Sequence, residues 1–346
     1  MGNIAAKTHR AVGERLCGIV ARIATEGPWP ALRVLNTLRS IAAFSRTLPG
    51  LLRSGPDIWR STVTINGPKL VLISATQQEK AARFLALHEA PGAFVIPNPW
   101  DVGSARVLAG LGFQALATSS AASACAAGKR DGGLTRNEAL AHARVIVNAT
   151  DLPVSADLEK GFGDAPEVVA ETVRLAAEAG LVGCTIEDST GNADKPLYDL
   201  SLAVERIAAA AEAADSLEFP FLVTARAHNF VYPNPSLDET IERLQAFERA
   251  AADVLFAPGL PSLDAVKKVC SAISRPFNFM AGIKGKSFPI DELTAAGVKR
   301  ISVATSFYRA AMTGFLAAAC MVRDTGQFHF LNESLTTPEL NELMQI

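Results

Sequence analysis

The sequence has few cysteines, and they are not arranged for a disulfide framework or a zinc site. The five cysteines, Cys17, Cys125, Cys184, Cys270 and Cys320, lie far apart, and no C-x-x-C pair occurs. Scattered single cysteines are typical of reduced thiols in an intracellular protein. We therefore expect a cytoplasmic protein whose cysteines carry no structural bridge.

Long apolar runs and an excess of one charge are also missing. No stretch of 18 uninterrupted apolar residues occurs, so we expect no membrane span. The formal net charge is only -2 over 346 residues, and this balance does not indicate a nucleic-acid partner. A hydrophobic content of 49% suits a globular protein with a substantial core.

The charge that is present is unevenly distributed. Residues 1–75 carry ten Lys/Arg and three Asp/Glu, a balance of +7, whereas the other 23 basic and 32 acidic residues give -9. We predict that residues 1–75 are a basic N-terminal extension, poorly ordered or non-native, with no part in the chemistry. An organelle transit peptide, non-native sequence before the true start and a basic membrane-surface helix over residues 12–23 all stay open.

From about residue 92 the pattern predicts eight strands, each followed by a helix, at a spacing of roughly 25–35 residues. The expected strands are residues 94–97, 115–119, 154–159, 183–187, 221–225, 254–257, 277–281 and 300–304. The expected helices are residues 104–111, 135 onward, 166–179, 202–214, 237–251, 263–273, 290–296 and 308–322.

These strands are short and apolar on both faces, as in a buried parallel sheet. No G-x-G-x-x-G follows the first strand. Polar residues follow nearly every strand, whereas in a doubly wound sheet they would gather at a single switch point. We therefore predict a closed (β/α)8 TIM barrel over residues 76–325, and not an open doubly wound sheet. Residues 326–346 are left as an unassigned C-terminal tail.

The end of the third strand carries two carboxylates, Asp157 and Glu159. Residues two apart on a strand point to the same face, so these groups should lie side by side. Adjacent carboxylates repel unless a cation or a shared proton lies between them. The alternative is that they cap the next helix, but Asp164, just before Pro166, is the better candidate for that cap. A divalent-metal or substrate site is the favoured interpretation.

Other strand ends should add to this site, because active sites of TIM barrels lie at the C-terminal ends of the strands. Three polar groups have alternative roles: Asp101 as a helix cap, Arg226 as a structural ion-pair partner and His228 as a bonded histidine without a role. The candidates are Asp101, Ser119, Ser120, Asp157, Glu159, Glu187, Asp188, Arg226 and His228.

Two loops supplement these strand ends. Residues 128–133 carry Lys129, Arg130 and Asp131 between glycines, either as a plain surface loop or as a grip for a carboxylate or phosphate. Asp131 would then join the metal site. Residues 189–198 are small and polar, as expected of a mobile lid.

At these residues the chain resembles the isocitrate lyase / phosphoenolpyruvate mutase superfamily, and most closely its phosphoenolpyruvate-phosphonomutase-like branch. The resemblance covers roughly residues 76–325 in order and spacing. The matching segments are Asn98-Pro99-Trp100-Asp101, Ser119-Ser120, Gly128-Lys129-Arg130-Asp131, residues 155–163, Thr185-Ile186-Glu187-Asp188 and Thr224-Ala225-Arg226.

The resemblance implies a (β/α)8 barrel, with the last helix swapped between subunits of a homotetramer, and a Mg²⁺ site that could also take Mn²⁺. It implies that the metal is held, largely through water, by Asp157, Glu159 and Glu187. It further implies catalytic roles for Arg226 and Asp131, and substrate binding by Ser119, Ser120, the amide of Ala121, Arg226 and Asn192. The implied substrate is a small 2-oxo or 2-hydroxy carboxylate.

Three features depart from the family pattern. The loop at 189–198 has no cysteine, which argues against isocitrate lyase activity. Asn192 and Lys195 occur in the reverse of the order found in phosphonomutases, and His228 replaces a glutamate. We expect a Mg²⁺-dependent carbon–carbon lyase that forms an enolate. An oxaloacetate hydrolase, a P–C phosphonomutase and a carboxylate-binding barrel without turnover are the alternatives.

Overall fold

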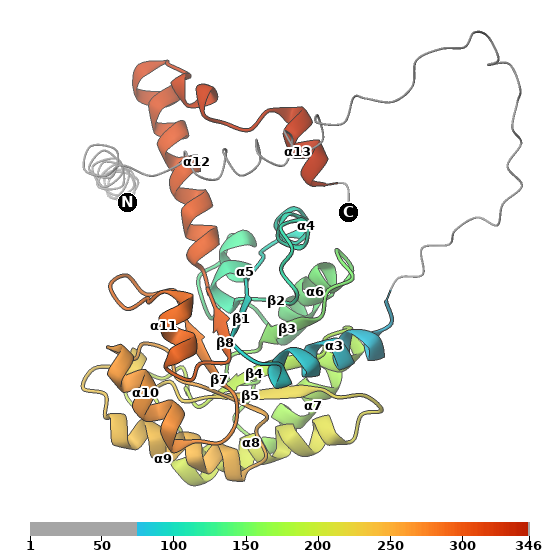
Figure 1. The fold of residues 1–346 in the computed structure, drawn as a ribbon, viewed down its shortest axis with the longest axis vertical. Helices are drawn as coiled ribbons and strands as arrows, with labels where there is room; N and C mark the ends of the chain where they lie inside the picture. Colours follow the sequence, from blue (N-terminus) through green and yellow to red (C-terminus); the bar gives the residue numbers. More distant parts are fainter. Residues whose placement is uncertain (1–74, 345–346) are drawn as a thin grey trace, which may run out of the picture. The chain divides into compact units, whose positions relative to one another are not determined.

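The computed structural model describes residues 75–344 (Figure 1). The predicted basic extension therefore lies outside the described residues, apart from Ala75. The chain divides into two compact units. Within the described residues, one comprises 75–312 with 329–344 and contains all eight strands, and the other comprises 313–328.

All eight predicted strands are present and parallel, so the predicted TIM barrel is confirmed. Their order in the sheet is β1-β8-β7-β6-β5-β4-β3-β2. Each predicted boundary agrees with the observed one to within two residues. The strands are β1 (Phe94–Ile96), β2 (Leu116–Ala117), β3 (Val154–Asp157), β4 (Gly183–Glu187), β5 (Leu222–Arg226), β6 (Val254–Phe256), β7 (Phe277–Met280) and β8 (Arg300–Ser302).

The barrel is closed between β1 and β2 by hydrogen bonds just beyond β1. The amide of Ala117 donates to the carbonyl of Pro97 at 3.0 Å. The buried side chain of Asn98 donates from Nδ2 to the carbonyl of Thr118 at 3.0 Å, and its Oδ1 accepts from the amide of Val303 at 3.0 Å. Asn98 thus joins the ends of three neighbouring strands, because its one amide supplies both a donor and an acceptor.

The eight predicted helices are also present, and Figure 1 shows α6 to α11 around the strands. They are α4 (Val102–Gly110), α6 (Arg136–Val147), α7 (Pro166–Glu178), α8 (Leu200–Asp215), α9 (Leu237–Arg249), α10 (Leu263–Ala272), α11 (Ile290–Ala295) and α12 (Ser306–Thr325). In α12 no described residue is buried. This suits the expected exchange of the last helix between subunits, which stays a prediction.

Among residues 75–344, three further α-helices lie outside the predicted set, together with the short 3-10 turns Asn229–Val231 and His329–Asn332. They are α3 (Gln77–Glu89), α5 (Ser120–Ala126) and α13 (Thr337–Leu343). Residues 120–126 are only serine, alanine and cysteine, so α5 has no hydrophobic period to reveal it. Helix α13 lies in the C-terminal tail after residue 325, where Thr336 and Glu339 form a capping box.

Of two predicted helix caps, one is confirmed and one is wrong. Asp101 is the N-cap of α4, where its carboxylate accepts from the amide of Ser104 at 2.7 Å. Asp164 does not cap α7, because the N-cap is Ala165, which provides no side-chain bond. The carboxylate of Asp164 instead accepts from Lys160 at 2.8 Å and from the hydroxyl of Tyr198.

Replacing Asp101 by alanine should lower the free energy of unfolding by about 1 kcal/mol, because one amide of the first turn loses its acceptor. For a domain of this size we expect Tm to fall by about 2–4 °C in a thermal melt. Glu89→Ala, at the exposed last residue of α3, is the matched control. Equal Tm values for the two variants would show that the Asp101 cap does not stabilise the fold.

Candidate active site

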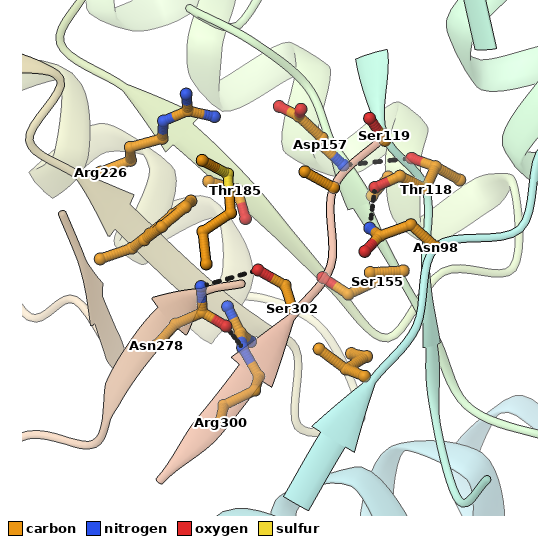
Figure 2. A pocket seen from close by; sticks show the side chains of 16 residues that line it. Asn98, Thr118, Ser119, Ser155, Asp157, Thr185, Arg226, Asn278, Arg300 and Ser302 are labelled. Atoms are coloured by element: carbon orange, nitrogen blue, oxygen red, sulfur yellow. Dashed lines mark hydrogen bonds between the residues drawn. The ribbon is translucent and has the colours of Figure 1, made fainter. Parts of the chain in front are cut away.

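Two cavities lie at the barrel and share Arg226. The outer one, here called the mouth, has a volume of about 570 Å³. It is lined by Ser120, Asp131, Gly132, Glu159, Lys160, Glu187, Ser189, Thr190, Gly191, Arg226 and His228. The inner cavity, inside the barrel, has a volume of about 50 Å³, and Figure 2 shows its lining residues. Ser119 and Asp157 line the inner cavity. Ala121 and Asn192 line neither.

Asp157 and Glu159 lie together, but not for the reason that the sequence suggested. Strand β3 ends at Asp157, and Glu159 has a φ of 52°, in the left-handed region that non-glycine residues rarely adopt. The amide of Glu159 donates to Oδ1 of Asp157 at 3.2 Å. The amide and hydroxyl of Ser120 donate to Oδ2 of Asp157 at 3.2 and 2.9 Å. A strained turn held by Asp157 therefore places Glu159, and simple strand alternation does not.

Burial and neighbouring carboxylates raise the pKa of two acidic groups at the mouth, Glu159 and Asp131. Burial, followed by the charges of Asp157, Glu187 and Asp131, raises the pKa of Glu159 to about 7. Asp131 keeps access to solvent, yet partial burial and then the charge of Asp157 raise its pKa as well. Four carboxylates brought this close are unfavourable without a compensating cation. The predicted convergence of acidic groups is therefore present.

Glu187 is held in its charged form by two neighbours from β5 and the turn after it. Burial would raise its pKa, but Arg226 and then His228 lower it below the ordinary value. Oε2 of Glu187 lies 3.4 Å from Nε of Arg226 and 3.1 Å from Nδ1 of His228. Neither nitrogen meets the geometric criteria of a good hydrogen bond in this arrangement. Arg226 also stacks over Phe256, 5.0 Å from the ring centroid.

Asp188, the next residue, does not take part in this cluster. Its buried carboxylate accepts from the amide of His228 at 2.7 Å and from Arg243 of α9 at 3.3 Å. Burial raises its pKa to about 6. Because side chains alternate along a strand, Glu187 turns into the barrel while Asp188 turns toward the helices. Asp188 therefore fixes the ends of β4 and β5 next to the site.

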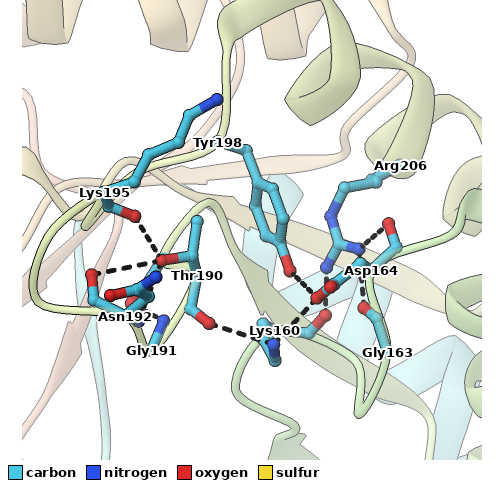
Figure 3. A network of polar contacts seen from close by, with 10 residues as sticks. Lys160, Gly163, Asp164, Thr190, Gly191, Asn192, Lys195, Tyr198 and Arg206 are labelled. Carbon is cyan, nitrogen blue, oxygen red and sulfur yellow. Dashed lines mark hydrogen bonds and ion pairs between the residues drawn. The ribbon is translucent and has the colours of Figure 1, made fainter.

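The loop at 189–198 lies over the mouth through its first residues only. Ser189, Thr190 and Gly191 line the mouth, and the carbonyl of Thr190 accepts from Lys160 at 3.0 Å. Asn192 instead braces the loop, as Figure 3 shows: its amide donates to Oγ1 of Thr190 at 2.9 Å. Its Oδ1 accepts from the amide of Asp194 at 2.9 Å. Its substrate contact stays a prediction.

Arg206 of α8 is a structural support for the site that the sequence did not single out. It is 1% exposed and donates to the carbonyls of Gly163 at 2.7 Å, Asp164 at 2.5 Å and Lys160 (Figure 3). Its guanidinium lies 4.2 Å from the ring centroid of Tyr198. Arg206 thus joins the loop after β3 to Tyr198 at the end of the loop at 189–198. A lone arginine in an alanine-rich helix was the signal available in the sequence.

The remaining candidates are placed as follows. Ser119 is the N-cap of α5 and accepts from the amide of Ala122 at 3.4 Å. Lys129 pairs with Glu138 at 2.6 Å on the surface. Asp131 is the residue of the 128–133 loop that reaches the mouth together with Gly132.

The side chains at the site suit a hard cation that keeps part of its water shell better than a cation bound directly by protein atoms alone. Within residues 75–344, no three His, Cys, Asp or Glu side chains are close enough together to ligate one ion. The groups nearest the site are carboxylates and hydroxyls, the oxygen donors that Mg²⁺ prefers, and Mg²⁺ usually keeps several waters. The raised pKa values of Glu159 and Asp131 show a surplus of negative charge that such a cation would relieve.

A closed parallel barrel with carboxylates and an arginine at the C-terminal ends of its strands defines a TIM-barrel enzyme. Comparison with known proteins gives the family. Residues 84–323 match the model of the phosphoenolpyruvate phosphomutase family, which is most of the chain. The chain belongs to this family, within the phosphoenolpyruvate mutase/isocitrate lyase superfamily of enzymes.

Three relatives illustrate the match. A solved structure from Burkholderia cenocepacia J2315, a "putative lyase/mutase", is 50% identical, with a TM-score of 0.77, covering 78% of this chain and 98% of that one. "Probable 2-methylisocitrate lyase 2" of Corynebacterium glutamicum is 30% identical over 73% of this chain and 83% of its own. The 2,3-dimethylmalate lyase of Eubacterium barkeri is 28% identical over 76% and 93%.

In residues 75–344, no helix is both long and apolar enough to cross a bilayer.

Proposed function

We propose that the chain is a Mg²⁺-dependent lyase that cleaves a C–C bond in a small 2-hydroxy or 2-oxo carboxylate and forms an enolate. The observation that carries this proposal is the crowding of Asp131, Glu159 and Glu187 around one mouth that Arg226 also lines, with Asp157 close enough to raise the pKa of Glu159. Surplus carboxylates favour a divalent cation, and one guanidinium favours an anionic substrate.

In this proposal the metal would be held by Asp157, Glu159 and Glu187, with Asp131 nearby, through intervening water. Bound Mg²⁺ would act as a Lewis acid toward the oxo and carboxylate oxygens, an effect worth several kcal/mol. The hydrogen bonds from Ser120 hold Asp157 in place for this role. Arg226 keeps Glu187 charged, so that this carboxylate is available to a cation at neutral pH.

The substrate would bind at the junction of the two cavities. Arg226 lines both cavities and suits planar, two-point recognition of a carboxylate or of the developing oxyanion. Ser119, Ser120 and the amide of Ala121 stand at the start of α5, where the helix N-terminus favours negative charge. Asn192 would reach the substrate only if the loop at 189–198 moved, because its side chain now forms a hydrogen bond within that loop.

The names of the relatives support this substrate class. Curated relatives are named as lyases of 2-methylisocitrate and of 2,3-dimethylmalate, both branched hydroxy acids. Oxaloacetate hydrolysis and P–C rearrangement are alternatives within the superfamily. A cytoplasmic homotetramer is the remaining expectation.

A carboxylate-binding barrel without turnover is the second candidate. The observation that favours it is His228, which lies beside Glu187 where the family resemblance implies a glutamate. An enzyme should exchange the C3 protons of pyruvate in a Mg²⁺-dependent way, whereas a pure binder should only be stabilised by the ligand. Proton NMR in D₂O separates the two.

Thermal melting of the full chain tests the site. Mg²⁺ with oxalate, which resembles the enolate of pyruvate, should raise Tm by about 10–20 °C when both are near 100 times their Kd. In Glu159→Ala this joint shift should be lost, whereas the surface variant Glu171→Ala should keep it, since Glu171 lies outside both cavities and pairs with Arg136 of α6. The shift is compared within each variant, because removing Glu159 also changes the Tm of the free protein.

No joint shift in the wild type would contradict the metal–enolate proposal. A shift retained in Glu159→Ala would place the ligand elsewhere than in the mouth.

A further inference from the structure

A second arginine lies inside the barrel, below the active site. Arg300 of β8 is only 4% exposed and lines the inner cavity with Asn278 of β7 and Ser302. Figure 2 shows Asp157 and Arg226 toward one side of this cavity and Arg300 toward the other. Branched apolar side chains usually fill the interior of a TIM barrel. A hollow, charged interior is therefore unusual.

Arg300 has no counter-ion in the described part of the chain. Its Nε donates to Oδ1 of Asn278 at 2.8 Å, one Nη donates to Oγ1 of Thr224 at 2.9 Å, and the other lies 3.4 Å from Nε2 of His88. His88 is neutral: its Nδ1 contacts the carbonyl of Phe84 at 2.8 Å, which requires a proton there and leaves Nε2 as an acceptor. Burial, followed by Arg300, lowers the pKa of His88 to about 3.

The guanidinium also has more donors than these neighbours can use. It carries five N–H groups, and the three contacts above account for only three of them. Burial lowers the pKa of Arg300 to about 9, so the group is still charged at pH 7. A buried charge without a partner of opposite sign is strongly unfavourable.

The other charges of the inner cavity do not compensate Arg300. Its lining includes two arginines, Arg226 and Arg300, and one carboxylate, Asp157. Asp157 already accepts three hydrogen bonds from the amide and hydroxyl of Ser120 and the amide of Glu159. Arg226 faces Glu187 of the mouth at 3.4 Å, whereas no carboxylate of the described residues forms an ion pair with Arg300. Ser155, Thr185 and Ser302 add hydroxyl groups.

We propose that the inner cavity binds one small monoanion, of the size of a halide ion or a single carboxylate group, held by Arg300 and the hydroxyl of Ser302. A water needs about 10–15 Å³ of such space, so about 50 Å³ suffices for one compact anion but not for the carbon skeleton of a substrate. The anion is either a free halide or a carboxylate that enters from the mouth.

Anion titrations of the full chain in halide-free buffer without Mg²⁺ test the free-halide source. Sodium bromide, chloride or formate should raise Tm saturably, by about 3–6 °C at ten times the Kd. The bulky sulfonate of sodium MES at equal ionic strength should not. Arg300→Met should lose the saturable shift, Arg300→Lys should keep a weaker one, and the surface variant Arg174→Met should behave as wild type.

Oxalate with Mg²⁺ tests the other source. Loss of the oxalate shift in Arg300→Met, with no halide shift in the wild type, would identify the anion as the ligand's own carboxylate. If neither the Tm shift caused by halide nor the Tm shift caused by oxalate depends on Arg300, the proposal is wrong. The halide experiment does not rely on the proposed function, so the two can fail separately.

Crystals of the wild-type protein grown in sodium bromide provide a measurement that needs no variant. We expect an anomalous bromine peak in contact with the Arg300 guanidinium. Water alone in the inner cavity, together with an unchanged Tm in formate and oxalate, would overturn the proposal even if Arg300→Met failed to fold.

Discussion

Replacing Arg226 by methionine should lower the rate of Mg²⁺-dependent pyruvate C3 proton exchange by about 10²–10³-fold, the usual loss when one preorganised donor to a developing oxyanion is removed. Arg226 is the arginine shared by the mouth and the inner cavity, 3.4 Å from Glu187 and stacked on Phe256. Methionine keeps much of the stacking volume but removes the charge.

Arg226→Lys should recover only part of the rate, because an ammonium cannot make the planar two-point contact of a guanidinium. Loss of the positive charge in Arg226→Met should also raise the pKa of Glu187, which Arg226 now lowers. Arg174→Met, on the exposed surface of α7, is the control for general effects of arginine loss. An exchange rate in Arg226→Met within a factor of two of wild type would remove Arg226 from the chemistry.

In metal-free protein, stability should fall as the pH rises from about 4.5 to about 7, because of Glu159. Its pKa is raised from the ordinary 4.5 to about 7 by burial and then by neighbouring carboxylates. Between these values the folded state holds a proton that the unfolded state has released, so the slope of stability against pH is negative. Above about pH 7 both states are ionised and the contribution is constant.

The full pKa shift of Glu159 would lower the free energy of unfolding by about 3 kcal/mol between these pH values. We expect a loss of about 2 kcal/mol, because water reaches the mouth and screens the charges. Asp131 and Asp188 also have raised pKa values and act in the same direction, whereas Glu187 has a lowered one and opposes them. Urea unfolding in EDTA at several pH values measures the slope. Glu159→Gln should flatten it, and so should saturating Mg²⁺, because a cation favours the ionised carboxylates.

An unchanged slope in Glu159→Gln would contradict the crowding of charges at the mouth. Glu171→Gln serves as the matched surface control, since Glu171 lies outside both cavities.

The strand and helix pattern was predictable because each strand is a short apolar run between turn residues, and each helix has its own period or cap. Asp101 and Thr135 show this at the level of single residues, since both form capping boxes with the residue three positions later. Helix α5 was not predictable, because its serines and alanines have no apolar face. Asp164 was misassigned, because Lys160 and the distant Tyr198 bind its carboxylate.

The sequence by itself determined the barrel and the set of residues at the strand ends, because local hydrophobic periodicity defines each element and parallel closure brings the C-terminal ends together. Only the tertiary structure decided how those residues are used. The left-handed turn at Glu159, the inward Glu187 against the outward Asp188, and the meeting of Arg300 with His88, 212 residues away, all depend on contacts between distant segments. Such contacts leave no local period, since they arise from packing across the barrel.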